Sequence, residues 1–274
     1  MSQTVIYILI AVFVALFAFI YRFFTNPFFF ARVVRFFLCF RYRAELRGFE
    51  QVMSSPRFLI MPNHPAYVDP FLLFTAIYAR NRKASPMTDE KFFRNAAYRQ
   101  ILKLGDAVIV PDLTKNRSEV AVRQAAELVH IAVKALDEGR SLVFYPSGHV
   151  TLDGKENIGA RRLAFETVSS IQLSPADSPL RQVRLFLLRT RGLETSRTAK
   201  SRSKLLDKKG HVRQDALPWT FTQPKWYQRR HVTMHFEDMT DTLLEWARQY
   251  DKSGFNRKLE EWYNQTNESP KQTN

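Results

Sequence analysis

The chain has 274 residues, of which 45% are hydrophobic and 24% charged, a balance typical of a folded protein with one sizeable core. This composition excludes an intrinsically disordered chain, and the single cysteine, Cys39, excludes an internal disulfide framework. The formal net charge of +15 predicts attraction to an acidic partner, namely nucleic acid, an anionic bilayer surface or phosphorylated substrates.

An apolar run near the N-terminus predicts a membrane anchor over residues 1–26. Residues 5–21 are almost entirely apolar and, with their edges, reach the roughly 20 residues that a spanning helix needs. No small-residue cleavage site follows, which favours a retained anchor over a removed signal peptide. Arginines follow the run and residues 1–4 carry no charged side chain, so the positive-inside rule places the main domain in the cytoplasm. An anchor that dips into one leaflet fits the same hydropathy.

Residues 27–48 interleave phenylalanines with arginines. This pattern is typical of a helix in the headgroup plane of an anionic phospholipid bilayer, with aromatic rings buried and guanidinium groups on the lipid phosphates. The alternative is a helix that packs on the core of the protein itself.

Residues 49–240 show a rhythm of strands and helices after a short connection at 48–56. The strands at 142–145 and 183–188 are apolar on both faces, as buried parallel strands are. The pattern predicts an α/β domain with a mostly parallel sheet flanked by helices. Further strands are expected at 57–61, 107–110 and 230–236, and helices at 70–79, 92–103 and 118–138.

The C-terminal part of the chain contains three further segments. Residues 197–213 are rich in Lys and Arg and predict a basic loop; a nucleic-acid arm is the alternative, although no nucleic-acid module is recognisable. Residues 241–265 are expected to be helical, and residues 266–274 to form a disordered tail. His231 and His235 share one face of the strand at 230–236, where a half-exposed polar face is favoured over a metal site.

A histidine and a carboxylate lie five residues apart directly after the strand at 57–61. His64 can take a proton from a hydroxyl, while ionised Asp69 fixes its tautomer and stabilises the imidazolium. On one continuous helix these side chains would point in poorly matched directions, so the pair requires a turn around Pro65. Alternatively, Asp69 caps a helix that has Pro70 at its first position.

Two other strand ends carry chemically capable side chains. One strand runs into Tyr145, Pro146, Ser147, Gly148 and His149, and another ends at Arg189 and Arg191. Ligands of parallel α/β sheets bind outside the carboxyl ends of the strands, so these ends are expected to share one edge with His64. Arginine forks suit phosphate oxygens; a surface salt-bridge pair is the alternative for the two arginines.

Asn63 and His64, followed after four residues by Asp69, resemble the first motif of the glycerolipid acyltransferases related to bacterial lysophosphatidate acyltransferase. The segment at 144–149 is similar to their third motif, which binds the glycerol acceptor, but Ser147 stands where the family has glutamate. Ala66 replaces a common serine, and Asp112 follows the second-motif region where many members have arginine. The resemblance covers roughly residues 45–240 and indicates a variant subfamily with a Tyr-Pro-Ser-Gly third motif.

This resemblance implies a membrane-bound O-acyltransferase for phospholipid synthesis or remodelling. It would move a fatty acyl group from acyl-CoA or acyl carrier protein, as co-substrate, to the hydroxyl of a lysophospholipid such as 1-acylglycerol-3-phosphate, without a cofactor or a metal. His64 would be the base and Asp69 its partner, whereas the acceptor would be bound by Asn63, Tyr145, Pro146, Ser147, Gly148, His149, Arg189 and Arg191.

Other functions stay open beside this one. The missing third-motif glutamate is compatible with a lipid-binding member of the same fold that has no turnover. An esterase would use the same His-Asp pair, but the sequence has no Gly-x-Ser-x-Gly elbow for a serine nucleophile. A nucleic-acid binder would show affinity that falls with salt.

Overall fold

The computed structural model describes residues 3–94, 96–110, 118–151, 154–196, 200, 209 and 227–265. Asp112, most of the basic segment at 197–213 and the C-terminal tail at 266–274 therefore lie outside the described residues. The helices are α1 (Gln3–Thr25), α2 (Pro27–Arg41), α3 (Phe49–Ser54), α4 (Asp69–Ala79), α5 (Ala96–Leu104), α6 (Ser118–Asp137), α7 (Leu163–Leu173), α9 (Thr240–Gln249) and α10 (Lys252–Asn264), with 3-10 turns η1 (Glu90–Arg94) and η3 (Pro179–Gln182).

A seven-stranded sheet forms the centre of the domain, in the order β1-β7-β6-β2-β5-β3-β4. Every neighbouring pair is parallel except β6 with β7, which confirms the predicted mostly parallel sheet. The strands are β1 (Tyr42–Arg47), β2 (Phe58–Pro62), β3 (Ser85–Asp89), β4 (Val108–Val110), β5 (Leu142–Val143), β6 (Arg184–Arg191) and β7 (Arg230–Asp238).

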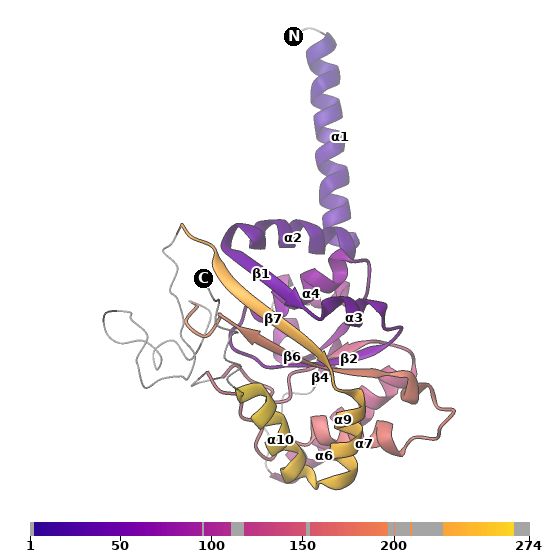
Figure 1. The fold of residues 1–274 in the computed structure, drawn as a ribbon. Coiled ribbons are helices and arrows are strands. Elements are labelled where there is room, and N and C mark those ends of the chain that lie inside the picture. The colour runs from indigo at the N-terminus through magenta and orange to yellow at the C-terminus, as the bar shows by residue number, and fades with distance from the viewer. Residues whose placement is uncertain are drawn as a thin grey trace.

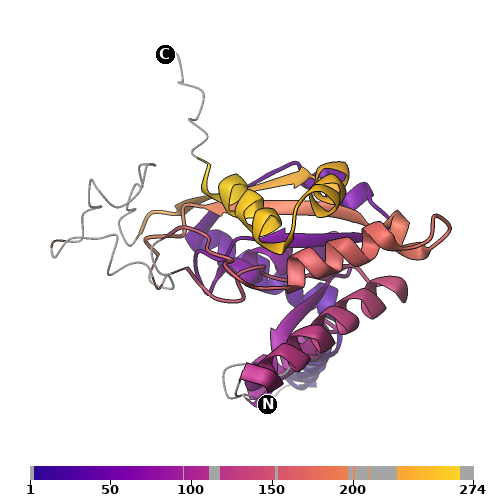
Figure 2. The ribbon, with the colours of Figure 1, turned by 90° about the horizontal axis from the view of Figure 1, so that it is seen from below.

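Helices cover both faces of this sheet, and successive residues of β2 point into two separate cores. Leu59 and Met61 belong to the core formed with α6, α7, α9 and α10, which lie nearest the viewer in Figure 2. Phe58 and Ile60 belong to the core formed with α2, α3 and α4, on the other side of the sheet in Figure 1. All five residues of β2 are buried, because a strand covered on both faces needs apolar side chains at every position.

Four elements differ from the sequence prediction. β1 lies in the segment predicted as interfacial, and α3 replaces the predicted short connection by burying Phe49 and Val52. β3 was not predicted because Pro86 lacks the N–H that a strand ladder uses, but its ladder with β5 is only two residues long. The helix expected at 92–103 begins as the 3-10 turn η1 and continues as α5.

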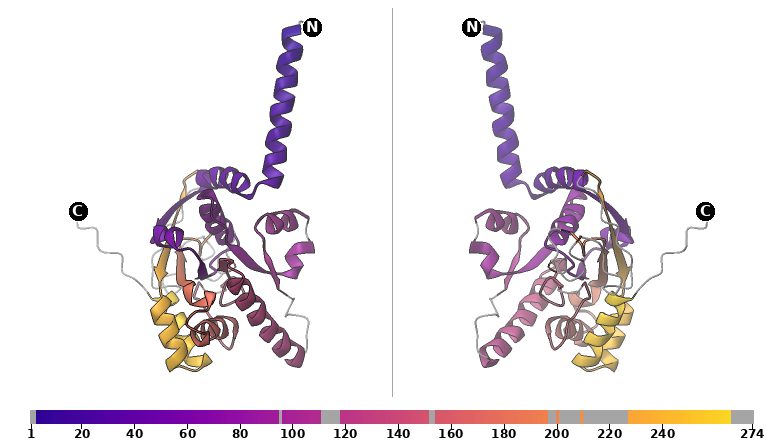
Figure 3. Two further views of the ribbon diagram at one scale, coloured as in Figure 1. Left: turned by 90° about the vertical axis from the view of Figure 1, so that its right-hand side faces the viewer. Right: turned by 90° about the vertical axis from the view of Figure 1, so that its left-hand side faces the viewer.

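The α1 helix projects from the domain, as Figures 1 and 3 show. It has 23 residues, none of them buried, and is long and apolar enough to cross a membrane. At its end the side chain of Asn26 accepts hydrogen bonds from the N–H groups of Phe28 and Phe29, each at 3.0 Å, and Pro27 occupies the first turn of α2. This N-cap ends α1 and starts α2 in a new direction.

The α2 helix packs partly on the core of the protein, as the second alternative predicted, and its placement at a bilayer stays a prediction. Its Ala31 is buried, and Phe28 lies 5.9 Å from the ring of Tyr78 in α4, so one face packs on the protein core. Phe36, Phe37 and Phe40 remain about 60% or more exposed. The helix therefore has an apolar aromatic surface, at the base of α1, that the described protein does not cover.

Gly192, directly after β6, sits where only glycine fits. Its φ is +90°, and a Cβ atom there would lie 2.3 Å from the carbonyl oxygen of His231 on β7. Gly139 also has a positive φ, +88°, but a Cβ atom there would come no closer than 4.0 Å to a neighbouring atom. Comparing substitutions at the two glycines therefore separates the cost of backbone strain from the cost of a steric clash.

We expect Gly192→Ala to lower the free energy of unfolding by about 3 kcal/mol and Gly139→Ala by only about 1 kcal/mol, because the second substitution adds strain without a clash. Denaturant unfolding in detergent micelles, followed by circular dichroism, measures both. Equal losses would show that β7 moves away from Gly192 without cost.

Candidate active site

The strands that carry the predicted site residues are immediate neighbours in the sheet. β2 lies between β5 and β6 and is parallel to both, with Pro62 in register with Leu188. The segments that leave these three strands therefore emerge at one edge, which confirms that the ends bearing His64, Ser147 and Arg189 converge.

The predicted turn around Pro65 brings His64 and Asp69 together. Nδ1 of His64 lies 3.0 Å from Oδ2 of Asp69, and the same oxygen accepts the N–H of Ala66 at 3.4 Å. Asp69 is the first residue of α4, and Val68 is the N-cap residue, without a side-chain cap. The alternative in which Asp69 caps the helix is therefore wrong, because its carboxylate points to the histidine.

Burial and charge act on the imidazole of His64 in opposite directions. Its side chain is only 14% exposed, and this burial lowers its pKa, but the Asp69 carboxylate, with a smaller contribution from Glu156, raises the pKa above 6.5 overall. The contact with Asp69 occupies Nδ1. The second ring nitrogen, Nε2, is thus the atom that can exchange a proton with a ligand.

Tyr145 completes the environment of the pair. Its ring stacks on the imidazole of His64 with 4.1 Å between centroids, and its hydroxyl donates to Oδ1 of Asp69 at 2.9 Å. Burial and the nearby Asp69 raise the pKa of Tyr145 well above 10, so the hydroxyl stays a donor. Both carboxylate oxygens of Asp69 are therefore engaged, and the tyrosine orients the pair.

The rest of the 145–149 segment forms a turn with several internal hydrogen bonds. The N–H of Gly148 donates to the carbonyl of Tyr145 at 2.9 Å, and the hydroxyl of Ser147 donates to the carbonyl of His149 at 3.1 Å. Nδ1 of His149 lies 2.6 Å from the carbonyl oxygen of Ser147. Pro146 and Ser147 are buried, and the N–H of Gly148 serves the turn itself, whereas the hydroxyl of Ser147 also acts on the carboxylate of Glu156.

Asn63 links two strands. Its Nδ2 donates to the carbonyl of Thr190 at 3.0 Å, and its Oδ1 accepts the N–H of the same residue at 2.7 Å. Both ends of the amide are therefore used, and Asn63 fixes the end of β2 against β6 at the point where Arg189 and Arg191 leave.

The two arginines of β6 point to the same face of the sheet. Arg189 is 3% exposed, its guanidinium lies 4.2 Å from the ring centroid of Trp262 in α10, and its Nε and Nη1 make no hydrogen bond with any described residue. Burial and the adjacent Arg191 lower the pKa of Arg189 to about 10. Arg191 donates to the carbonyl of Gln265. The surface salt-bridge alternative is wrong for Arg189.

Residues 43–175 match the family model described as Acyltransferase. The matched residues make up just under half of the chain and include His64, Asp69 and Tyr145. The crystal structure of the 1-acyl-sn-glycerophosphate (LPA) acyltransferase PlsC from Thermotoga maritima is similar at a TM-score of 0.48 and 14% identity, over 87% of this chain and 78% of that one. No curated protein matches the sequence.

The segment that matches the family model contains a buried carboxylate that the sequence did not reveal. Glu156 is 4% exposed, and its Oε2 accepts the main-chain N–H of His64 at 3.2 Å. Burial raises the pKa of Glu156 to about 7, although the Ser147 hydroxyl and the His64 N–H oppose the shift. No spacing rule points to this residue, because its contact with His64 spans 92 positions.

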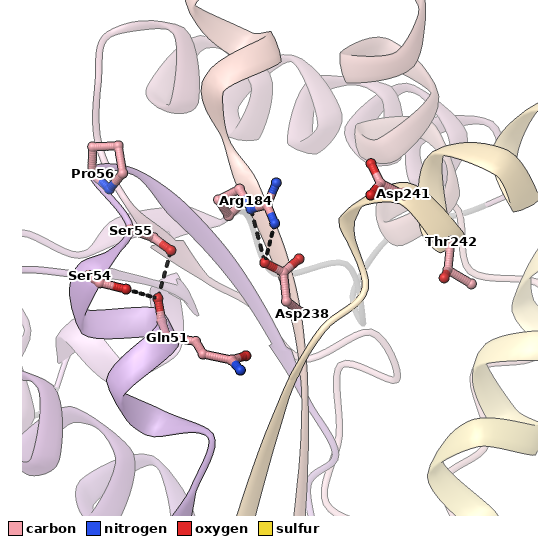
Figure 4. A pocket seen from close by; sticks show the side chains of 8 residues that line it. All are labelled: Gln51, Ser54, Ser55, Pro56, Arg184, Asp238, Asp241 and Thr242. Atoms are coloured by element: carbon pink, nitrogen blue, oxygen red, sulfur yellow. Dashed lines mark hydrogen bonds and ion pairs between the residues drawn. The ribbon is translucent and has the colours of Figure 1, made fainter.

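Two other features of the described residues bear on the site. No group of three His, Cys, Asp or Glu side chains gathers there as a metal site would require. A polar pocket of about 630 Å³ lies at the opposite ends of β2 and β6, lined by Gln51, Ser54, Ser55, Pro56, Arg184, Asp238, Asp241 and Thr242 (Figure 4). None of the candidate site residues lines this pocket, so we do not assign the active site to it.

We expect Asp69→Asn to lower the pKa of His64 below that of the wild type, because burial of the imidazole remains while the opposing charge is lost. Tyr145→Phe keeps the stacked ring and the carboxylate, so its effect should be smaller. NMR titration of the His64 ring resonances measures both pKa values. An unchanged pKa in Asp69→Asn would contradict the pairing.

Proposed function

We propose that the chain transfers a fatty acyl group from a thioester to the hydroxyl of a lysophospholipid such as 1-acylglycerol-3-phosphate. The observation that carries this proposal is the contact between His64 and Asp69 at the sheet edge, inside the segment that matches the acyltransferase family. A buried histidine that has a carboxylate partner on one ring nitrogen and presents the other to a ligand is suited to activate a hydroxyl.

The reaction then follows from the residues of the site. Nε2 of His64 takes the proton of the acceptor hydroxyl as its oxygen attacks the thioester carbonyl carbon. The tetrahedral intermediate collapses, the C–S bond breaks, and the imidazolium returns the proton to the departing thiolate. Asp69 stabilises the imidazolium, while Tyr145 keeps the carboxylate aligned. No metal and no covalent enzyme intermediate is required.

The arginines of β6 provide the site for the acceptor phosphate. Arg189 has two guanidinium nitrogens without a hydrogen-bond partner among the described residues, and such a buried cation is stabilised when an anion accepts from it. Arg191 leaves the same face of the strand two residues later. A phosphate held there would lie at the strand end next to the one that presents His64.

The acyltransferase domain works at a membrane surface in this proposal. The α1 helix would hold the chain in the bilayer, and the exposed Phe36, Phe37 and Phe40 would enter the headgroup region of an anionic leaflet, with the domain in the cytoplasm. The substrate and product can then stay in the bilayer. Extracting an acyl chain into water would cost about 0.8 kcal/mol for each methylene.

The donor is a thioester of coenzyme A or of acyl carrier protein. Both carriers are acidic, and the net charge of +15 favours their approach. The transfer assay described below for His64→Ala uses both carriers and so decides between them.

We expect His64→Ala to lower kcat about a hundredfold to ten-thousandfold, because the acceptor hydroxyl loses its base. The assay follows labelled oleoyl from coenzyme A and from acyl carrier protein to a panel of lysophospholipids, with detergent-solubilised protein. His231→Ala is the matched control, since His231 is exposed on β7.

Turnover that persists in His64→Ala would contradict the role of this base. Absence of turnover in the wild type with every donor, combined with measurable lysophospholipid binding, would favour the lipid-binding alternative. That alternative draws on Ser147, which stands in place of the family glutamate and whose hydroxyl is used inside its own turn.

We expect Arg189→Met to raise the KM for 1-acylglycerol-3-phosphate about tenfold to a hundredfold, because a charge-assisted hydrogen bond to a buried phosphate is worth about 1.5–3 kcal/mol. The KM for an acceptor without a phosphomonoester should change much less. Arg184→Met is the control, because Arg184 starts the same strand and pairs with Asp238 at the opposite end. An equal KM change with both acceptors would argue against a phosphate site.

A further inference from the structure

A carboxylate that follows the 145–149 turn in the sequence, that of Glu156, lies close to His64. Ser147 carries no charge, but Glu156 from the following loop is buried and interacts electrostatically with His64, Asp69 and Tyr145. The loop thus supplies, nine residues later, the acidic group that the turn lacks. The proposed mechanism so far gives this glutamate no role.

The contacts of Glu156 are directed at the main chain of the proposed base. Its Oε2 accepts the N–H of His64 at 3.2 Å, and Thr151 from the same loop donates its N–H to the carbonyl of His64 at 2.9 Å. The main-chain N–H and carbonyl of His64 are therefore held by Glu156 and Thr151, respectively. Oε1 of Glu156 is buried and accepts no hydrogen bond from the described residues.

The C-terminal helix holds this loop in place. The side chain of Asn264 accepts the N–H of Glu156 and donates to its carbonyl, both at 2.9 Å. Oε1 of Glu260, one turn earlier, accepts the N–H groups of Ile158 at 2.6 Å and Gly159 at 2.8 Å. These four hydrogen bonds from α10 fix the main chain that carries the Glu156 side chain, and thereby hold its carboxylate in place.

Several charged or titratable groups surround Glu156. His64 comes from the turn after β2, Asp69 from α4, Tyr145 from the end of β5, Arg161 from the loop before α7 and Tyr263 from α10. Lys200 acts on His64 in the opposite sense to the two carboxylates. Burial raises the pKa of Glu156 to about 7, so above that pH the carboxylate is ionised, and its negative charge then stabilises a positive imidazole more strongly than it would in water.

We infer that Glu156 is a positioning residue for acyl transfer, whose carboxylate holds the main chain of His64 and stabilises the imidazolium that forms when His64 takes the acceptor proton. This inference rests on the proposed function. It assigns two separable effects to one side chain: a hydrogen bond to the N–H of His64 and a charge near its ring.

Two substitutions separate these effects. Glu156→Gln keeps an acceptor for the N–H of His64 but removes the charge. Because His64 must be neutral to act as a base, kcat/KM rises with pH through its pKa, and loss of a nearby negative charge moves this acidic limb to lower pH. We expect that shift together with an about threefold to tenfold fall in kcat and unchanged KM, since a weaker base transfers the proton less readily.

Glu156→Asp keeps the charge on a shorter side chain that does not reach the N–H of His64. Its acidic limb should stay close to that of the wild type, while kcat falls. Glu194→Gln is the matched control, because Glu194 is also fully buried, has a pKa raised by burial to about 7 and bonds a main-chain N–H, that of Gly192. It is not among the groups that act on His64, so its limb should not move.

A second readout is independent of turnover. NMR titration of the His64 ring in the same four proteins should show a lower pKa in Glu156→Gln only. If the wild type transfers no acyl group but this shift appears, the proposed function fails, while the effect of the Glu156 charge on the pKa of His64 is confirmed. An unmoved limb and an unmoved NMR titration in Glu156→Gln, or equal shifts in Glu194→Gln, would overturn the inference.

Discussion

The hydrogen-bonded ladders of β2 with β5 on one side and β6 on the other determine where every candidate group lies. Because the three strands are parallel and adjacent, their ends present the imidazole of His64, a turn and two arginines along one edge. Asn63 locks the end of β2 to Thr190 through both ends of its amide. A slip of either ladder would separate the imidazole from the guanidinium groups, so the core that buries β2 also sets the geometry of the site.

The site concentrates buried polar groups that a purely structural core would avoid. Asp69 is fully engaged by His64 and Tyr145, whereas Arg189 and Glu156 retain nitrogen or oxygen atoms without partners among the described residues. Each such atom costs about 1–3 kcal/mol of desolvation. A protein tolerates these costs where function needs them, and the apolar strands beneath the edge provide the compensating stability.

Local patterns predicted the central elements well. The apolar strands, the helix after Asp69 and the His-Asp contact follow from short-range spacing, and the structure confirms them. β1 and β3 escaped notice because an edge strand with alternating charges and a strand containing Pro86 have weak local signals. Glu156 and Asn264 were missed for a different reason: their contact spans 108 positions, and only the packing of the last helix on the loop creates it. The engaged amide of Asn63 and the buried Arg189 likewise depend on neighbours distant in the sequence.

The dependence of the 156–159 loop on α10 has a consequence for biosynthesis. Chains fold as they are synthesised, from the N-terminal end onward. The α1 helix is synthesised long before Glu260 and Asn264 of α10. In the proposed membrane-bound enzyme, a nascent chain already held at a bilayer would therefore have an unsupported loop beside His64 until α10 docks. Translation order itself would keep an unfinished polypeptide from acting on the surrounding lipids.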